Sequence, residues 1–262
     1  MQLNLDGRHA LVCGASQGIG RASAIELALL GANVTLLARR AGELETLAAE
    51  LPRIHADQHH DFIAIDVGDT AVLRARADAL AADAPVHILV NNSGGPPPGN
   101  VLDATPEEFL AAWQQHLLAC HVLAQALVPG MRAAGWGRIV NVISTSVREP
   151  IPGIGVSNTT RGAVASWAKT LAGELAPSGI TVNNVLPGST RTPRIEQIVA
   201  ARAEKGGKSP AEVQQAMEAE VPMRRFADAS EIAAAVAFLA SPAASYITGV
   251  SLAVDGGRMR SL

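Results

Sequence analysis

The chain has few aromatic residues, few cysteines and no surplus of positive charge. Only 3% of its 262 residues are aromatic, and a single one of these is a tyrosine, Tyr246. The two cysteines, Cys13 and Cys120, lack the CxxC spacing of redox or metal motifs, so we interpret both as buried small side chains in a reducing compartment. With 21 basic and 24 acidic residues, the chain lacks the basic excess typical of nucleic-acid-binding surfaces.

Long apolar runs are also absent. No stretch is long enough to span a bilayer, and the N-terminus lacks the charged and apolar regions of a signal peptide. We therefore expect a cytoplasmic protein without membrane or nucleic-acid partners. One cluster, formed by His55, Asp57, His59, His60 and Asp61, has metal-ligating residue types but no helical spacing. It is interpreted as a solvated loop, and no metal is expected.

Strand-like and helix-like segments alternate along the chain. Apolar runs typical of buried strands occupy residues 10–12, 33–37, 62–65, 87–90, 138–143, 180–186 and 250–254, and helical periodicity occupies residues 20–30, 43–51, 71–82, 106–131, 162–175 and 230–239. This alternation predicts an α/β fold, with one doubly wound domain over 1–262 and helices on both faces of a parallel seven-stranded sheet.

One segment departs from that alternation. Residues 189–226 are charged and interrupted by glycines, and they would leave the carboxyl end of a strand, where ligands bind in this architecture. We expect this segment on the substrate side. Arg191 and Arg194 within it could meet an acidic or phosphopantetheine-bearing substrate.

A glycine-rich turn follows the first predicted strand. It contains Gly14, Ser16, Gln17, Gly18, Ile19 and Gly20 and opens the first predicted helix. Glycine permits a tight turn and lets backbone N–H groups approach a pyrophosphate, whose charge is favoured by the positive end of a helix. The GxxxGxG spacing at a strand-to-helix junction therefore predicts a dinucleotide site.

The second predicted strand ends without an acidic residue. A carboxylate there would hold the ribose hydroxyls of NAD, whereas Ala38, Arg39 and Arg40 leave room and positive charge for the 2′-phosphate of NADP. We therefore predict that Arg39 and Arg40 bind NADP(H). The alternative is a solvated pair of arginines at a strand end.

Further motifs follow in a fixed order over nearly the whole chain. They are Asp66–Val67, Asn91–Asn92–Ser93–Gly94, Pro187–Gly188 and the terminal stretch from Tyr246–Ile247–Thr248–Gly249 to Asp255–Gly256–Gly257. With the glycine turn they make the chain similar to the short-chain dehydrogenase/reductase family, in particular its 3-oxoacyl-acyl-carrier-protein reductase branch. The resemblance implies a Rossmann fold and a homotetramer. It also implies cofactor contacts from Asp66, Val67, Asn91, Ser93, Gly94, Arg161, Pro187, Gly188, Thr190 and Thr192.

The same resemblance exposes a departure at the catalytic residues. Members of the family use a serine, a Tyr-xxx-Lys pair and usually an asparagine. Ser144 matches the serine, but Ser157 stands at the tyrosine position, Arg161 at the lysine position and His116 at the asparagine position. No YxxxK motif occurs anywhere, because a valine lies four residues after the only tyrosine.

These replacements change the chemistry that the site can perform. Arg161 can hold the nicotinamide ribose and a developing alkoxide, but it cannot release a proton near neutral pH. Ser144 and Ser157 can orient or relay a proton. His116 is the one residue of the four with a suitable unshifted pKa, about 6.5, so it is a candidate proton donor. If its ring faces the neighbouring helix, it is a packing residue instead.

Three functions remain open. The first is an NADPH-dependent carbonyl reductase of the 3-oxoacyl type, acting on a small carbonyl compound or acyl thioester with the rebuilt site. The second is an NADP(H)-binding protein without reductase activity that acts through assembly or regulation. The third is a non-redox enzyme that resembles the halohydrin dehalogenases. It fits worst, because those enzymes replace the glycine turn by a halide pocket and retain the tyrosine.

Overall fold

A single parallel sheet forms the centre of the protein, whose computed structural model describes residues 1–261. Its strands are β1 (His9–Cys13), β2 (Asn33–Ala38), β3 (His60–Ala64), β4 (Ile88–Asn91), β5 (Gly137–Val142), β6 (Ile180–Pro187) and β7 (Ser251–Val254). Their order in space is β3-β2-β1-β4-β5-β6-β7, and all neighbouring pairs are parallel. The predicted Rossmann fold is confirmed. Because the strand order reverses between β1 and β4, a ligand is expected outside their carboxyl ends.

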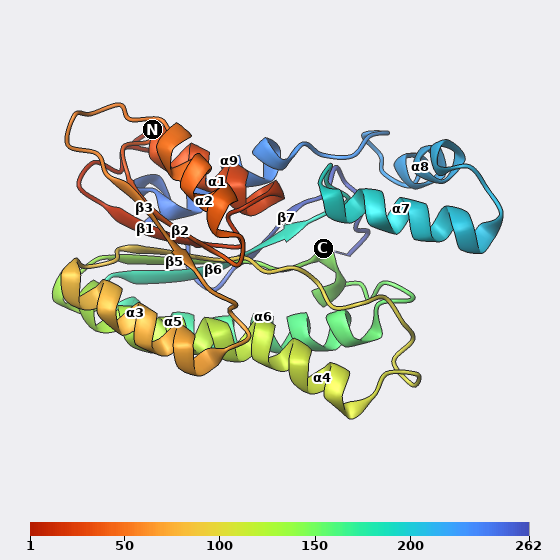
Figure 1. The fold of residues 1–262 in the computed structure, drawn as a ribbon, viewed down its shortest axis with the longest axis horizontal. Coiled ribbons are helices and arrows are strands. Elements are labelled where there is room, and N and C mark those ends of the chain that lie inside the picture. The colour runs from red at the N-terminus through yellow and green to blue at the C-terminus, as the bar shows by residue number, and fades with distance from the viewer. Residues whose placement is uncertain (262) are drawn as a thin grey trace.

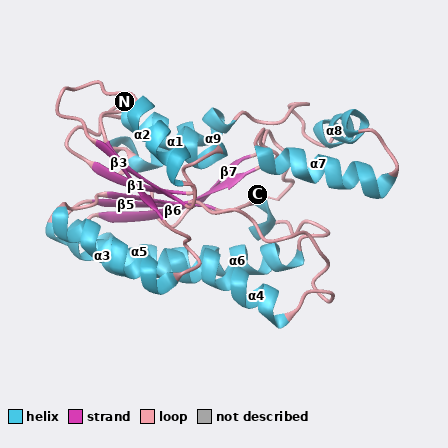
Figure 2. Ribbon diagram, viewed as in Figure 1, coloured by secondary structure: helices cyan, strands magenta, loops and turns pink. Residues whose placement is uncertain are grey.

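Helices cover both faces of this sheet (Figures 1 and 2). One layer contains α1 (Gly18–Leu29), α2 (Ala41–Glu50) and α9 (Ala229–Ala240), and the other contains α3 (Thr70–Asp83), α4 (Pro106–Trp113), α5 (Ala119–Ala133) and α6 (Gly155–Leu175). Side chains alternate between the layers along each strand. In β1 and β4, Val12 and Val90 join the core under α1, whereas Leu11 and Leu89 join the core over α5. Burial on both faces explains the continuous apolar runs in the sequence.

The predicted helix over residues 106–131 is not regular. It consists of α4, a π-helical turn at Gln114–Leu118 and α5. The π-helical turn includes His116 and interrupts the α-helical hydrogen-bond pattern there. Such turns occur frequently at functional sites.

Helix α6 begins earlier than its apolar periodicity predicts, at Gly155 rather than residue 162. Its first turns therefore include Ser157 and Arg161, which lie four residues apart on one face of the helix. The Arg161 Nε atom donates a hydrogen bond to Ser157 Oγ over 3.3 Å.

The segment 189–226 contains two helices that the sequence analysis did not predict. These are α7 (Pro193–Gly206) and α8 (Pro210–Ala219), which project beyond the sheet at the upper right of Figure 1. They enclose a small apolar core of their own, formed by Val199, Ala203, Val213, Met217 and Phe226. Within residues 1–261, no helix is long and apolar enough to cross a membrane.

Candidate active site

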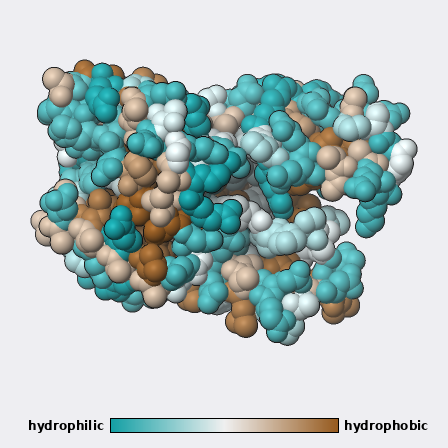
Figure 3. Space-filling view, in the orientation of Figure 1, coloured by the Kyte–Doolittle hydropathy of each residue, from teal (hydrophilic) through white to brown (hydrophobic). Residues whose placement is uncertain are grey.

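A cleft of about 570 Å³ is lined by segments at the carboxyl ends of the strands. Figure 3 shows a recess in the middle of the molecule, between the α7–α8 segment and the helices below the sheet. The predicted site residues that line the cleft are Gly14, Ser16, Gln17, Gly18, Ile19, Arg39, Arg40, Asp66, Val67, Ser93, Gly94, Ser144, Ser157, Arg161, Pro187, Gly188, Thr190 and Thr192. The structure thus brings together most of the residues singled out by their motifs.

The glycine turn has a backbone that requires glycine. Gly14 and Gly18 have φ values of +60° and +57°, which other residues rarely adopt. A Cβ atom on Gly14 would also lie 2.6 Å from Asn92 Nδ2. Helix α1 starts at Gly18 without an acidic residue in its first turn, and the Gln17 side chain makes no capping hydrogen bond. The first N–H groups of α1 therefore remain available to an anion, as a dinucleotide diphosphate requires.

Two residues predicted to bind the cofactor, Gly20 and Asn91, also have a structural role, and neither lines the cleft. A Cβ atom on Gly20 would overlap the carbonyl oxygen of Gly14, so Gly20 permits close packing of the turn on α1. The buried Asn91 donates from Nδ2 to Asn141 Oδ1 over 2.8 Å, and Asn141 donates to Asn184 Oδ1 over 2.9 Å. This chain of amides joins β4, β5 and β6 beneath the cleft.

Arg39 and Arg40 lie on the predicted adenine side of the cleft. The Nη2 atom of Arg40 donates to Ser16 Oγ over 3.1 Å and to Gln17 Oε1 over 2.8 Å. Arg39 Nη1 lies 3.7 Å from the carboxylate of Asp66. Both arginines are exposed, and exposed ion pairs contribute little to stability. Both side chains can therefore turn toward a bound phosphate with little loss of stability.

The segment that follows β6 closes the cleft on the other side. The Gly188 amide donates to the Val254 carbonyl over 2.9 Å, and Thr190 Oγ1 donates to the Gly188 carbonyl over 3.1 Å. A Cβ atom on Gly18 would lie 3.1 Å from the Thr192 methyl group. Thr192 therefore faces the glycine turn across the cleft, and the space between them is narrow.

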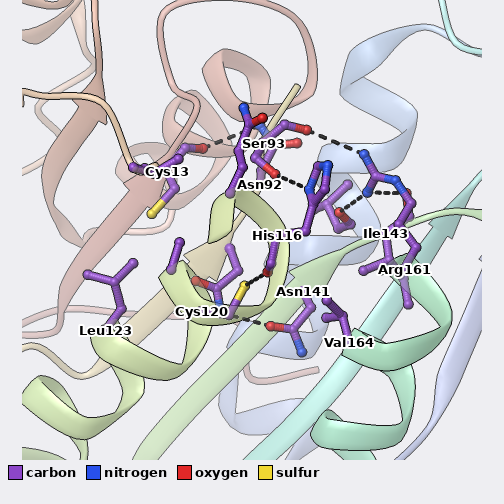
Figure 4. A pocket seen from close by; sticks show the side chains of 15 residues that line it. Cys13, Asn92, Ser93, His116, Cys120, Leu123, Asn141, Ile143, Arg161 and Val164 are labelled. Atoms are coloured by element: carbon purple, nitrogen blue, oxygen red, sulfur yellow. Dashed lines mark hydrogen bonds between the residues drawn. The ribbon is translucent and has the colours of Figure 1, made fainter. Parts of the chain in front are cut away.

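Arg161 is the buried charge at the predicted catalytic end of the cleft. It is only 9% exposed and, within residues 1–261, forms no salt bridge to a carboxylate. Its Nη1 atom donates to the Ile143 carbonyl over 3.0 Å, and its Nη2 atom donates to the Ser93 carbonyl over 3.5 Å (Figure 4). Burial lowers the pKa of Arg161 to about 10, so the guanidinium remains charged at neutral pH.

The two predicted catalytic serines differ in their hydrogen bonds. Ser157 Oγ accepts the hydrogen bond from Arg161 Nε, and Ser144 Oγ accepts a hydrogen bond from the Ser146 amide over 3.1 Å in the turn after β5. Both line the same cleft as Arg161. Their hydroxyl groups are therefore available to orient a carbonyl oxygen or a water molecule.

His116 does not line this cleft but a small adjoining cavity of about 20 Å³. In Figure 4 its ring lies between Ser93 and Arg161. Nδ1 shares a hydrogen bond of 2.7 Å with Ser93 Oγ, while Nε2 is buried without a hydrogen-bond partner among the described residues. Burial, followed by the charge of Arg161, lowers the pKa of His116 to about 3. The lowered pKa disfavours His116 as a proton donor at neutral pH.

The charges in the cleft favour an anionic ligand. Among the described residues that line it, Arg39, Arg40, Arg161 and Arg194 are basic, and Asp66 is the one carboxylate. Together with the open N-terminus of α1 and the glycine cradle, this charge balance fits a phosphorylated dinucleotide.

Two of the histidines in the cluster of metal-ligating residue types have other partners. His55 Nε2 lies 2.8 Å from Asp6 Oδ1, and His60 Nε2 lies 3.0 Å from the Pro52 carbonyl. Within residues 1–261, no group of three or more His, Cys, Asp or Glu residues is arranged to hold a metal. Cys13 and Cys120 are buried, as the sequence analysis predicts, and burial raises the pKa of the Cys120 thiol to about 12.

The fold and the glycine turn agree with the comparison with known families. A family model described as "Enoyl-(Acyl carrier protein) reductase" matches residues 14–258, from the first glycine of the turn to a point beyond β7. The chain belongs to the short-chain dehydrogenase/reductase family. Its general role is that of an oxidoreductase, as this membership and the similar proteins below support.

Similar proteins cover the whole chain. The NADPH-dependent reductase BacG of Bacillus subtilis is 30% identical over 97% of this chain and 99% of its own length. The structure of L-sorbose reductase from Gluconobacter frateurii, complexed with NADPH and L-sorbose, matches with a TM-score of 0.93 and 31% identity over all of both chains. The structure of 3-oxoacyl (acyl-carrier-protein) reductase from Agrobacterium tumefaciens with NADP bound matches with a TM-score of 0.87 and 27% identity, over 97% of this chain and 95% of that chain. The cofactor in all three agrees with that predicted from Arg39 and Arg40.

Sequence reasoning did not find several residues that shape the cleft. Asn92 donates from Nδ2 to the carbonyls of Cys13 and Gly14 over 3.3 and 3.4 Å, so it ties the end of β4 to the glycine turn. Other lining residues without an individual predicted role are Gly95, Gln115, Ile154, Ile195 and Ile198, of which the last two lie in the segment 189–226 that is expected on the substrate side. Asn92 belongs to the Asn91–Gly94 motif, which predicts no such contact for it, and the other residues belong to no motif. Segments distant in sequence bring them together in the fold.

Proposed function

We propose that the chain is an NADPH-dependent carbonyl reductase whose catalytic site is rebuilt around Arg161, Ser144 and Ser157. The observation that carries this proposal is the buried guanidinium of Arg161, which shares one cleft with the glycine turn and lacks a carboxylate partner among residues 1–261. A fixed positive charge in such a place stabilises negative charge that develops on a substrate oxygen.

The chain's own residues account for cofactor binding. The glycine turn and the first N–H groups of α1 hold the diphosphate, and Arg39 and Arg40 hold the 2′-phosphate. Residues of the segment 187–192 and Arg161 line the same cleft, where they would hold the nicotinamide ribose. NADPH, when bound, supplies the hydride.

Arg161 and Ser144 orient the carbonyl of the substrate and stabilise the alkoxide that forms on its oxygen. The proton comes from water ordered by Ser144 and Ser157, because the serines are poor acids and Arg161 retains its proton at neutral pH. His116 stays neutral, since its pKa is lowered to about 3. It acts as a positioning residue through Ser93, whose hydroxyl group contacts His116 and whose carbonyl contacts Arg161.

We take 3-oxoacyl compounds as the first substrates to test. The similar structure of the 3-oxoacyl (acyl-carrier-protein) reductase from Agrobacterium tumefaciens supports this choice. The segment 189–226 forms the substrate side of the cleft, where Ile195 and Ile198 of α7 provide an apolar wall. A small carbonyl compound or an acyl thioester fits this open arrangement.

We also propose a cytoplasmic homotetramer. Leu110 and Trp113 on α4 are 63% and 40% exposed, and Tyr246 and Leu252 near β7 are 101% and 37% exposed. Apolar side chains exposed in groups are typical of interfaces between subunits. Light scattering should give the mass of a tetramer, and a clean monomer mass would refute the assembly.

The competing function is NADP(H) binding without turnover, which the absence of a tyrosine from the described cleft residues favours. NADPH oxidation with a panel of ketones and 3-oxoacyl thioesters distinguishes the two. We expect turnover by the wild type and a loss of about 10²- to 10³-fold in kcat for Arg161→Met. The exposed Arg132→Gln serves as the matched control. Tight NADPH binding without turnover of any compound would favour the binding protein.

A further inference from the structure

The two arginines that follow Pro187 have different surroundings. Arg191 is exposed, and its Nη1 atom lies 3.3 Å from the carboxylate of Asp228. Arg194 is half-buried and lines the cleft, and it forms no salt bridge within residues 1–261. One of its nitrogens, Nη2, donates to the Pro96 carbonyl over 2.9 Å. This bond fixes the side chain and leaves other N–H groups of the guanidinium available.

Arg194 and Arg161 meet at Gly95, in the loop after β4. A Cβ atom built on Gly95 would lie 3.7 Å from Arg194 Nη2 and 3.8 Å from Arg161 Nη2. Both nitrogens therefore lie within 4 Å of one point. This point is at the catalytic end of the cleft, because Arg161 also contacts Ser157 there.

Two guanidinium groups this close repel each other, and neither has a carboxylate to compensate its charge among the described residues. Burial lowers the pKa of Arg161, and the charge of Arg194 lowers it further. Such a pair is stabilised when an anion binds beside both groups, and the planar guanidinium matches a carboxylate especially well. The proposed cofactor phosphates lie elsewhere, at the glycine turn and at Arg39 and Arg40.

We propose that Arg194 binds a carboxylate of the substrate next to Arg161, so that the substrate is a short oxo acid. The inference rests on the proposed reductase function and names its substrate class. With the carboxylate one or two bonds from the carbonyl, both groups reach the pair of arginines together. The carbonyl carbon accepts the hydride of NADPH and the carbonyl oxygen accepts a proton from water. The products are a hydroxy acid, NADP⁺ and hydroxide.

Matched acid and ester substrates test this inference. Acetoacetate is compared with methyl acetoacetate, and pyruvate with methyl pyruvate, because each pair differs only in the free carboxylate. We expect the wild type to prefer the acids, and Arg194→Met to lower kcat/KM for the acids by about 10- to 100-fold, mainly through KM. The esters should change little. Arg191→Gln, which alters an exposed and paired arginine, should affect neither class, and Arg194→Lys should retain part of the preference for acids.

A binding measurement separates failure of this inference from failure of the proposed function. Malonate, a dicarboxylate without a reducible ketone, is titrated into the protein with NADPH bound, and affinity is followed by NADPH fluorescence. Turnover of esters and thioesters with equal effects of Arg194→Met on both classes would overturn the carboxylate site and leave the reductase standing. Absence of turnover with Arg194-dependent malonate binding would overturn the reductase and leave the site standing. Absence of any Arg194-dependent malonate binding would overturn the inference.

Discussion

The predicted cofactor-binding half and the predicted catalytic half of the cleft differ in the groups that they present to a ligand. The cofactor half depends on backbone geometry, with left-handed glycines at Gly14 and Gly18 and the open N-terminus of α1. The catalytic half depends on the functional groups of Ser144, Ser157 and Arg161. From the resemblance of the sequence, we predict that the first keeps the pattern of the family and that the second departs from it. Backbone cradles are fixed by the fold, but side-chain chemistry can be replaced on the same scaffold.

The most direct test of this difference is to introduce the family's tyrosine and lysine into the catalytic half. In the double variant Ser157→Tyr with Arg161→Lys, a phenol is placed one helical turn from an ammonium group on α6. If the remaining geometry is that of the family, carbonyl reduction should rise, by up to about 10²- to 10⁴-fold for a positioned general acid. Steady-state NADPH oxidation at pH 7 measures the change.

The two single variants are the controls for this experiment. Ser157→Tyr alone retains the arginine, and Arg161→Lys alone lacks the phenol, so neither should give the full increase. A double variant that binds NADPH normally and reduces carbonyls no faster than the wild type would show that the catalytic half has diverged in shape as well as in residue type.

The sequence predicts the two halves with unequal success, for a physical reason. A motif such as Gly14–Gly20 specifies a local backbone, so it predicts where a dinucleotide cradle lies. The same motif does not distinguish Gly18, which lines the cleft, from Gly20, whose missing Cβ makes room for a carbonyl oxygen. Asn91 likewise belongs to a motif, but its side-chain amide donates a hydrogen bond to Asn141 Oδ1.

The properties that sequence could not predict depend on contacts between distant segments. Residue type alone gives His116 an ordinary pKa, whereas burial in the π-helical turn and the charge of Arg161 lower that pKa to about 3. Arg191 and Arg194 are equivalent in sequence. Only the fold places Asp228 beside the first and leaves the second in the cleft.

A second prediction tests the cofactor half, where the expected effect is smaller. The double variant Arg39→Gln with Arg40→Gln removes the charges assigned to the 2′-phosphate. We expect affinity for NADPH to fall by about 10- to 100-fold, the range for charge-assisted hydrogen bonds, while affinity for NADH changes little. Calorimetric titration of both cofactors measures the ratio.

Arg74→Gln is a suitable control for that measurement, because Arg74 is exposed and pairs with Asp78 on α3, outside the cleft. An equal loss for NADPH and NADH would mean that Arg40 acts by holding Ser16 and Gln17 in place. Wild-type protein that prefers NADH would refute the assignment of the arginines altogether.

A third prediction concerns His116 and the pH dependence of stability. Its pKa is about 3 in the folded protein and about 6.5 in the unfolded chain, so below pH 6.5 the unfolded chain binds a proton that the folded protein does not. As the pH falls from 6.5 to 3, the titration of His116 therefore lowers the free energy of unfolding by roughly 1.4 kcal/mol for each pH unit. Asparagine, the usual residue of the family at this position, does not titrate.

Urea denaturation of the wild type and of His116→Asn at pH 8, 6, 5 and 4 measures this term. The difference between the two proteins at pH 8 gives the baseline cost of the substitution, and the wild type should lose stability faster than the variant as the pH falls. His9, His60 and His87, whose pKa values are also lowered by burial, are present in both proteins and cancel in the comparison. Because His116 is neutral throughout the working range, the pH profile of kcat/KM between about pH 5.5 and 8 should be the same in both proteins. Parallel denaturation curves combined with a lost titration in the rate profile would instead assign the proton to His116.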